Sequence, residues 1–187
     1  MKQLLFNPFT RIAGSKALIY GWLAILLTAV IANWSNFHID AELHMGPGAP
    51  APFEVFVIES LLAWVCTVIF FYFVAIAFSK SRVRFLDIAG TTALARWPLV
   101  FVAILSFIPV SDNVDAILKR DPAIILPLLL VGLLSLPFII LFVVLLYNAY
   151  AVSANLKGGK AVWTFILAML LSDIAARIVF HFLSQIF

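Results

Sequence analysis

The sequence predicts an all-α fold, a polytopic membrane protein built as a bundle of five transmembrane helices. Two observations support this. Of the 187 residues, 65% are hydrophobic and 11% are charged, whereas a soluble domain has about 45–50% and about 25%. Five apolar runs also reach the roughly 17–25 residues needed to cross about 30 Å of hydrocarbon. Because these runs use nearly the whole chain, we expect a single membrane domain and no soluble catalytic domain.

The runs place the five spans at approximately residues 17–34, 55–78, 94–110, 123–152 and 161–182. Backbone groups in lipid must be hydrogen-bonded within their own segment, so we expect each run to be a helix. The fourth run covers roughly 45 Å as a helix, so it must tilt, kink near Pro137 or project beyond the hydrocarbon. The tract "MGPGAPAP" between the first two spans predicts a turn without regular structure.

The distribution of Lys and Arg predicts the orientation. Short cytoplasmic connections of membrane proteins carry an excess of these residues. Eight Lys and Arg residues lie in the N-terminal arm and in the second and fourth connections between spans: Lys2, Arg11, Lys16, Lys80, Arg82, Arg84, Lys157 and Lys160. Two lie in the third connection, Lys119 and Arg120, and none lies in the first. The protein is therefore expected to be multi-pass with its N-terminus cytoplasmic and its C-terminus outside. Arg82, Arg84, Lys157 and Lys160 would then face the cytoplasmic membrane surface.

The arm before the first span, "MKQLLFNPFTRIAG", mixes apolar and basic residues. That pattern predicts a short amphipathic segment lying on the cytoplasmic leaflet, with Lys2 and Arg11 near anionic headgroups. Pro8 would break or restart a helix there. A signal peptide that includes the first span is the alternative, but this run is long and closes with Trp34, which suits an interfacial anchor.

Three charged residues lie inside the second and fifth runs. Asp173 and Arg177 are i,i+4 neighbours on one helix face, and Glu59 lies at a depth similar to that of Arg177. Charges inside a bilayer usually face the bundle and pair with one another. We therefore predict an intramembrane ionic cluster of Glu59, Asp173 and Arg177 that joins the second and fifth spans, either as a structural staple or as a proton or ion pathway.

Arg96 lies at the cytoplasmic start of the predicted third span, just before Pro98. Its long side chain is expected to reach the inner headgroups, and a contact with a ligand phosphate is the alternative.

The sequence contains no pattern that predicts catalysis or cofactor binding. The segment "FHIDAELH" alternates two His residues with Asp and Glu, but its spacing matches no standard zinc pattern. Motifs of zinc proteases, serine hydrolases, P-loops and dinucleotide-binding folds are absent from the sequence. We therefore predict no catalytic residues, no cofactor and no metal, and a protein that is not an enzyme.

Three stretches together resemble one family. They are "LFNPFTRI" before the first span, "SKSRVRFLDIAGTTALARWP" between the second and third, and "LLYNAYAVSANLKGGKAVWTFILAMLLSDIAARIV" across the last two. The chain is similar to the Yip (Ypt/Rab-interacting protein) family in its short bacterial form. The resemblance implies five spans, a cytoplasmic N-terminus and, for a bacterial member, the inner membrane.

The resemblance also implies a function without known catalysis. Eukaryotic relatives bind Rab-type GTPases, shape or traffic membranes and associate with one another. This chain has an arm of only about sixteen residues and lacks their D-L-Y-G-P type motif, which speaks against GTPase binding.

We expect a membrane-organising or protein-interaction module whose partners are lipids and, as candidates, other membrane proteins or a second copy of itself, but not nucleic acid. The alternative is a small transporter or channel that uses Asp173, Arg177 and Glu59. A lipid-handling enzyme is a more distant alternative.

Overall fold

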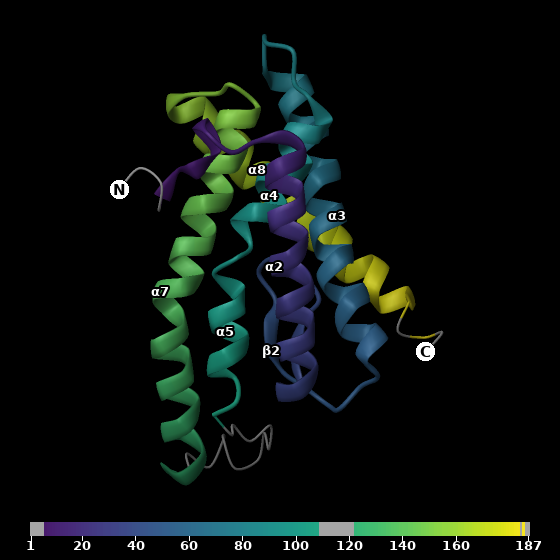
Figure 1. The fold of residues 1–187 in the computed structure, drawn as a ribbon, viewed down its shortest axis with the longest axis vertical. Helices are drawn as coiled ribbons and strands as arrows, with labels where there is room; N and C mark the ends of the chain where they lie inside the picture. The colour runs from purple at the N-terminus through teal and green to yellow at the C-terminus, as the bar shows by residue number, and fades with distance from the viewer. Residues whose placement is uncertain (1–5, 109–121, 184, 186–187) are drawn as a thin grey trace.

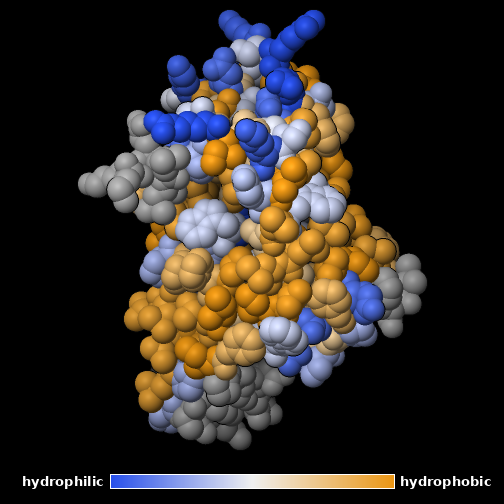
Figure 2. Space-filling view, in the orientation of Figure 1, coloured by the Kyte–Doolittle hydropathy of each residue, from blue (hydrophilic) through white to orange (hydrophobic). Residues whose placement is uncertain are grey.

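The computed structural model of the protein describes residues 6–108, 122–183 and 185. Within them, five helices are long and apolar enough to cross a membrane: Gly14–Ser35, Phe53–Phe78, Phe85–Leu105, Ile125–Ser153 and Gly158–Leu183. Figure 1 shows these helices gathered into one bundle. Figure 2 shows hydrophobic surface around its middle, and hydrophilic residues crowded at the upper end of the view. The chain is therefore a polytopic membrane protein with an all-α bundle.

The third span begins earlier than predicted and is broken. It consists of α4 (Phe85–Ala95) and α5 (Leu99–Leu105), so its start lies at residue 85 rather than 94. The apolar run did not include the first part because that part contains threonines. In the structure, the hydroxyls of Thr91 and Thr92 donate to backbone carbonyls of the same helix at 2.7 Å each, so their polar groups are satisfied within the helix. Between α4 and α5 the turn at residues 96–98 contains Pro98, which has no N–H to donate.

Helices α2 (Gly14–Ser35) and α4 pack unusually closely, because glycines lie where they cross. A Cβ placed on Gly21 would lie 2.4 Å from the backbone carbon of Ala93, and one on Gly90 would lie 2.3 Å from the carbonyl oxygen of Gly14. Small residues allow membrane helices to approach in this way. The close approach fixes α4, and with it the broken end at residue 96, against α2.

The connection between α2 and α3 (Phe53–Phe78) contains a β-hairpin that we did not predict. Of the tract "MGPGAPAP", residues 45–47 form its second strand, and residues 48–52 have no regular structure, as predicted. Asn36 takes a left-handed conformation (φ 51°) that ends α2. Strands β1 (Phe37–Ile39) and β2 (Met45–Pro47) then pair antiparallel, with His38 opposite Gly46. The hairpin turns back along the helices, and in Figure 1 it lies beside the lower half of α2.

The last two spans are α7 (Pro122–Ser153) and α8 (Gly158–Leu183). Helix α7 continues through Pro127 and Pro137, and in Figure 1 it extends below the end of α2. Phe71 of α3 lies between Tyr150 and Phe165, with ring centroids 5.0 and 5.7 Å away. These aromatic rings join α3, α7 and α8 at the centre of the core.

The described part of the N-terminal arm packs on α7 through a short 3₁₀ turn, η1 (Pro8–Thr10). Phe9 is 2% exposed and belongs to the main core, and the side-chain amide of Asn148 donates to the carbonyl of Phe6 at 2.8 Å. Phe9 is therefore not turned toward lipid, as an amphipathic segment on the leaflet would require. Of the described aromatic residues in this arm, only Phe6 is exposed (47%). Residues 1–5 lie outside the described part of the chain.

Candidate functional site at the inserted hairpin

Residues 36–48, which we call the inserted hairpin, carry polar groups deep into the helix bundle. Ala41, near its tip, is fully buried and clusters with Cys66 of α3 and Ala176 of α8. The tip also contacts Thr67, about 21 Å along α3 from its first residue by the rise of an α-helix. The segment therefore reaches near the middle of the span instead of resting on the bundle.

Glu42 at the hairpin tip forms a buried ion pair with Arg96. Its Oε2 lies 3.1 Å from Arg96 Nη2, and both side chains are at most 3% exposed. Thr67 donates its hydroxyl to the other oxygen of Glu42. Arg96 stands at the break of the third span, about 17 Å along it from Phe85. A break at membrane depth is tolerated where protein surrounds it, and here the hairpin does so.

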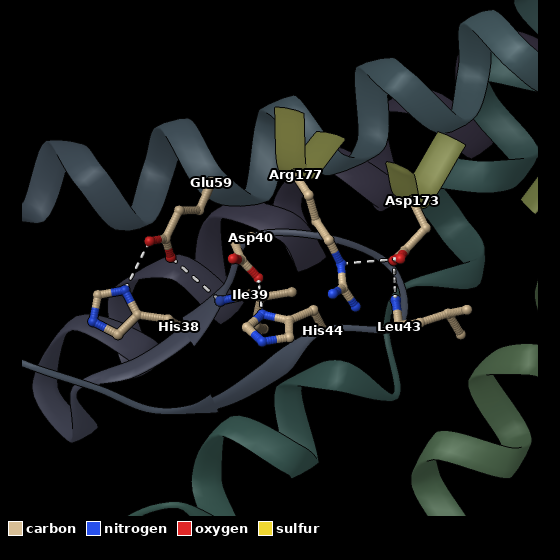
Figure 3. A network of polar contacts seen from close by, with 8 residues as sticks. All are labelled: His38, Ile39, Asp40, Leu43, His44, Glu59, Asp173 and Arg177. Carbon is tan, nitrogen blue, oxygen red and sulfur yellow. Dashed lines mark hydrogen bonds and ion pairs between the residues drawn. The ribbon is translucent and has the colours of Figure 1, made fainter. Parts of the chain in front are cut away.

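Asp173 of α8 holds the hairpin on its other side. Its Oδ1 accepts the backbone N–H of Leu43 at 2.8 Å, and its Oδ2 lies 3.1 Å from Arg177 Nε. Asp173 is buried, whereas the Arg177 side chain is 49% exposed. Both carboxylate oxygens are thus bound, one by the hairpin backbone and one by a cation at the bundle surface (Figure 3).

Glu59 of α3 anchors the first strand of the hairpin. Its Oε1 lies 2.7 Å from His38 Nδ1, and its Oε2 accepts the N–H of Ile39 at 3.3 Å. The other ring nitrogen of His38 lies 2.9 Å from the carbonyl oxygen of Ala49. Because both ring nitrogens face acceptors, the doubly protonated imidazolium fits this position best. The hydrogen bond with Glu59 raises the pKa of His38 above its ordinary value, against the opposing effect of burial.

The structure corrects the predicted cluster of Glu59, Asp173 and Arg177. It brings Asp173 and Arg177 together, but Glu59 binds His38 and Ile39, so the three do not form one triad. The reason is that the hairpin supplies nearer partners: Figure 3 shows its residues alongside both α3 and α8. Helices α3 and α8 pack directly on each other through Phe71 and Phe165, and their charged residues Glu59 and Asp173 each bind the hairpin instead of forming one ion-pair cluster.

Arg96 is also placed differently from the prediction. It lies in the middle of its span at 3% exposure, bound to Glu42, and does not extend to the inner headgroups. The prediction failed because the third span begins about ten residues earlier than its apolar run. An arginine that seemed close to the membrane surface is therefore deep in the bundle.

The alternating residues of "FHIDAELH" bind separate partners and do not converge. His38 meets Glu59, Glu42 meets Arg96, and His44 Nδ1 lies 2.6 Å from Asp40 Oδ1. Among the residues that the structure describes, no group of three or more His, Cys, Asp or Glu side chains is placed to hold a metal ion.

Four of the predicted basic interface residues lie in the connections, or in the adjoining first turn of α8, at the opposite end of the bundle from the hairpin (Figure 1). Arg82, Arg84, Lys157 and Lys160 are all exposed. Arg84 Nε lies 3.8 Å from Asp87 Oδ2. The prediction had grouped Arg96 with these residues, but Arg96 is bound in the core.

Sequence reasoning missed Glu42, Thr67 and His38 as parts of the network. One signal could have indicated them. The first connection carries acidic residues and histidines but no Lys or Arg, while Arg96 in a span needs an anionic partner. Complementary charges on a loop and a neighbouring span predict that the two meet.

Chemically, the network is built for mutual neutralisation. Two of its anions, Glu42 and Asp173, meet a cation and one further donor each, and Glu59 meets His38 and a backbone N–H. Comparison with known proteins identifies no family. No protein-family model matches the chain, and no curated protein or solved structure is significantly similar to it. The resemblance to the Yip family therefore remains a prediction from the sequence.

Proposed function

We propose that this protein is a non-enzymatic membrane-organising or protein-interaction module of the Yip type. The observation that carries the proposal is the inserted hairpin: its tip binds the buried charges of two spans, through Glu42 to Arg96 and through Leu43 to Asp173. Arg96 binds Glu42 through Nη2, while its buried Nη1 has no hydrogen-bond partner among the described residues. A charge held by a structural partner is poorly suited to pass a proton or ion along a pathway. The network instead locks the bundle into one shape.

The size and lining of two hollows in the bundle, one of them beside the Glu42–Arg96 pair, support the same function. Arg96 borders a hollow of about 10 Å³ together with Thr28 and Ser60, which is about the room that one water molecule needs. A hollow of about 460 Å³ lies between α7, α5, the end of α2 and the inserted hairpin, and its described lining contains no Asp, Glu, Lys, Arg or His. The first space has room for about one water and the second has no charged lining, so neither forms the extended, charged and hydrated route that an ion pathway requires.

The outer surface of α7 suits contact with lipids or other membrane proteins. Only 17% of its most apolar stretch is buried, against 72% for the third span. In an interaction module, the exposed apolar surface of α7 would contact neighbouring molecules in the membrane. The partners proposed are therefore lipids, other membrane proteins or a second copy. The exposed Phe6 of the arm would lie against the leaflet beside α7.

The second candidate is a small transporter, and the broken third span favours it. Discontinuous spans with a charged residue at the break often form substrate sites near the bilayer midplane. Here Arg96 stands at such a break. The candidate needs the hairpin to withdraw, because Glu42 occupies the arginine in the present conformation.

One reconstitution experiment separates the two functions. The purified protein is placed in vesicles that contain a pH-sensitive dye, and copies labelled with donor and acceptor fluorophores are reconstituted in parallel. A module is expected to show energy transfer between copies that grows with their density in the membrane, and no proton flux above empty vesicles. A flux that Glu42→Gln changes, without energy transfer, would establish the transporter instead.

A further inference from the structure

We propose that the protein holds the phosphate headgroup of an anionic phospholipid between its α3–α4 and α7–α8 connections. This lies beyond the proposed function and does not depend on it. A hollow of about 380 Å³ opens there, lined by Phe78, Lys80, Ser81, Asn155, Leu156, Lys157 and Lys160. We call it the lysine hollow. Three cations thus line one open hollow, although they come from two connections and the start of α8.

The lysines are available to an anion. Lys80, Lys157 and Lys160 are exposed, and none is paired with an acidic side chain among the residues that the structure describes. The described lining of the hollow contains no Asp or Glu. Asp87, in the first turn of α4, is directed to Arg84. Three ammonium groups around a space with this lining favour an anionic occupant.

The two connections that form the hollow are hydrogen-bonded to each other. The side-chain amide of Asn155 donates to the hydroxyl of Ser81 at 2.8 Å, which joins the two connections directly. A second hydroxyl contact, between Thr91 and Ser153 at 2.9 Å, ties α4 to the end of α7. Asn155 takes a left-handed conformation (φ 51°) that closes the turn after α7. The lysines therefore extend from two segments that are held together by hydrogen bonds.

The position of the hollow identifies the phosphate as that of a lipid. It lies at the ends of membrane helices, with Phe78 as the last residue of α3 and Lys160 in the first turn of α8. Trp163, in the next turn of α8, is 73% exposed, and exposed tryptophans of this kind mark the level of the headgroups. Buried Leu156 and half-exposed Phe78 add apolar surface on which the glycerol end of a lipid can rest.

The hydrophilic end of the bundle in Figure 2 is consistent with this placement. A phosphodiester in the hollow would accept hydrogen bonds from the three ammonium groups and from the Ser81 hydroxyl. The phosphate of phosphatidylglycerol fits this description. Phosphatidylethanolamine carries the same phosphate with an added ammonium group, which the three lysines would repel.

The test measures which lipid the protein retains. Full-length protein is equilibrated in detergent with equal amounts of phosphatidylglycerol and phosphatidylethanolamine, and bound lipids are counted by native mass spectrometry. The variant that combines Lys80→Gln, Lys157→Gln and Lys160→Gln is compared with wild type. We expect its preference for phosphatidylglycerol to fall roughly tenfold or more, because a lysine near an anionic surface contributes about fivefold in affinity.

Matched variants make the result specific. Arg11→Gln, Lys16→Gln and Arg82→Gln together remove the same charge from exposed residues outside the hollow, and should keep most of the preference. Lys→Arg changes at all three hollow positions should also keep it, since guanidinium groups bind phosphate well. Equal losses in the hollow and control variants would overturn the proposal. It would equally fail if a large excess of inorganic phosphate displaced the lipid, which would identify a soluble anion as the occupant.

Discussion

Glu42 and Arg96 meet where neither side chain reaches the bulk water or the headgroups. Their exposed fractions are 2% and 3%, so each charge depends on the other for compensation. Removing one partner of such a pair is more harmful than replacing both, because the remaining charge stays buried without a counter-ion. This asymmetry distinguishes the pair from Asp173 and Arg177, since the Arg177 side chain is half exposed and can find other partners.

The pair can be tested by a double-mutant cycle in detergent. Glu42→Gln should lower the free energy of unfolding by about 3–5 kcal/mol, because the arginine is left uncompensated. Glu42→Gln combined with Arg96→Met should restore a large part of that loss. Chemical denaturation of the four proteins gives the coupling energy. Strictly additive losses would show that the two side chains do not interact.

His38 gives the hairpin a dependence on pH. The folded pKa of His38 is raised above its ordinary value, chiefly by the hydrogen bond with Glu59. A raised histidine pKa adds stability that is complete below the ordinary pKa of about 6.5 and is lost as the pH rises through the folded value. We therefore expect the melting temperature of wild type to fall between mildly acidic and alkaline pH by more than that of His38→Gln.

The control for this experiment is His44→Gln, because His44 is paired within the hairpin, with Asp40, and is more exposed than His38. This variant removes a histidine but leaves the contact of His38 with Glu59 in place, so it should keep the part of the pH dependence that this contact contributes. A His38→Gln variant with the same pH dependence as wild type would show that the contact with Glu59 contributes nothing.

At the scale of elements, the helices were predictable where long apolar runs define them. The predicted second and fourth spans lie within a few residues of α3 and α7. The third span was not predictable from hydropathy, because α4 mixes threonines and an aspartate with small residues and is apolar only once its hydroxyls bond to the backbone. The residues of α4 alone do not indicate that this helix is surrounded by the other helices of the bundle.

The contacts of the candidate site also fall into two groups, those that the sequence predicts and those that it does not. The contact of Asp173 with Arg177 is local to one helix, so its i,i+4 spacing predicts it. The contacts of Glu42 and Glu59 join residues far apart in the chain, and several partners of suitable charge were available at similar depth. The path of the hairpin determines which of these possible partners meet. The Gly and Pro residues of "MGPGAPAP" predict a turn but do not indicate that the preceding segment inserts into the bundle.

The crossing of α2 and α4 carries a prediction at this scale. Gly90→Ala places a methyl group against the backbone of Gly14, and such overpacking typically costs about 1–3 kcal/mol. Gly132→Ala in α7 is the matched control, because nothing described lies within 4 Å of its added Cβ. Alanine favours helix over glycine, so the control should be neutral or slightly stabilising. Equal melting temperatures for the two variants would contradict the close crossing.

For the whole molecule, the bias of Lys and Arg predicts its orientation in the membrane. Reporter fusions that end after Lys16, Ser81 or Gly158 should report the cytoplasm. Fusions after Gly48 and at the C-terminal Phe187 should report the opposite side. Each position is tested with two reporters, one active only in the cytoplasm and one active only outside. A cytoplasmic C-terminus would contradict five spans.

The central claim is that residues 36–48 insert into the bundle and neutralise its charges, and the accessibility of two alanines tests it most directly. Ala41 is fully buried at the hairpin tip, whereas Ala49, which follows the hairpin in the same connection, is exposed. Each is changed to cysteine in a Cys66→Ala background, and intact membranes are treated with a maleimide that cannot cross the bilayer. With the maleimide on the side that this connection faces, Ala49→Cys should react at once, and Ala41→Cys only after denaturation. Equal, rapid labelling of both would place the connection in water and contradict the account.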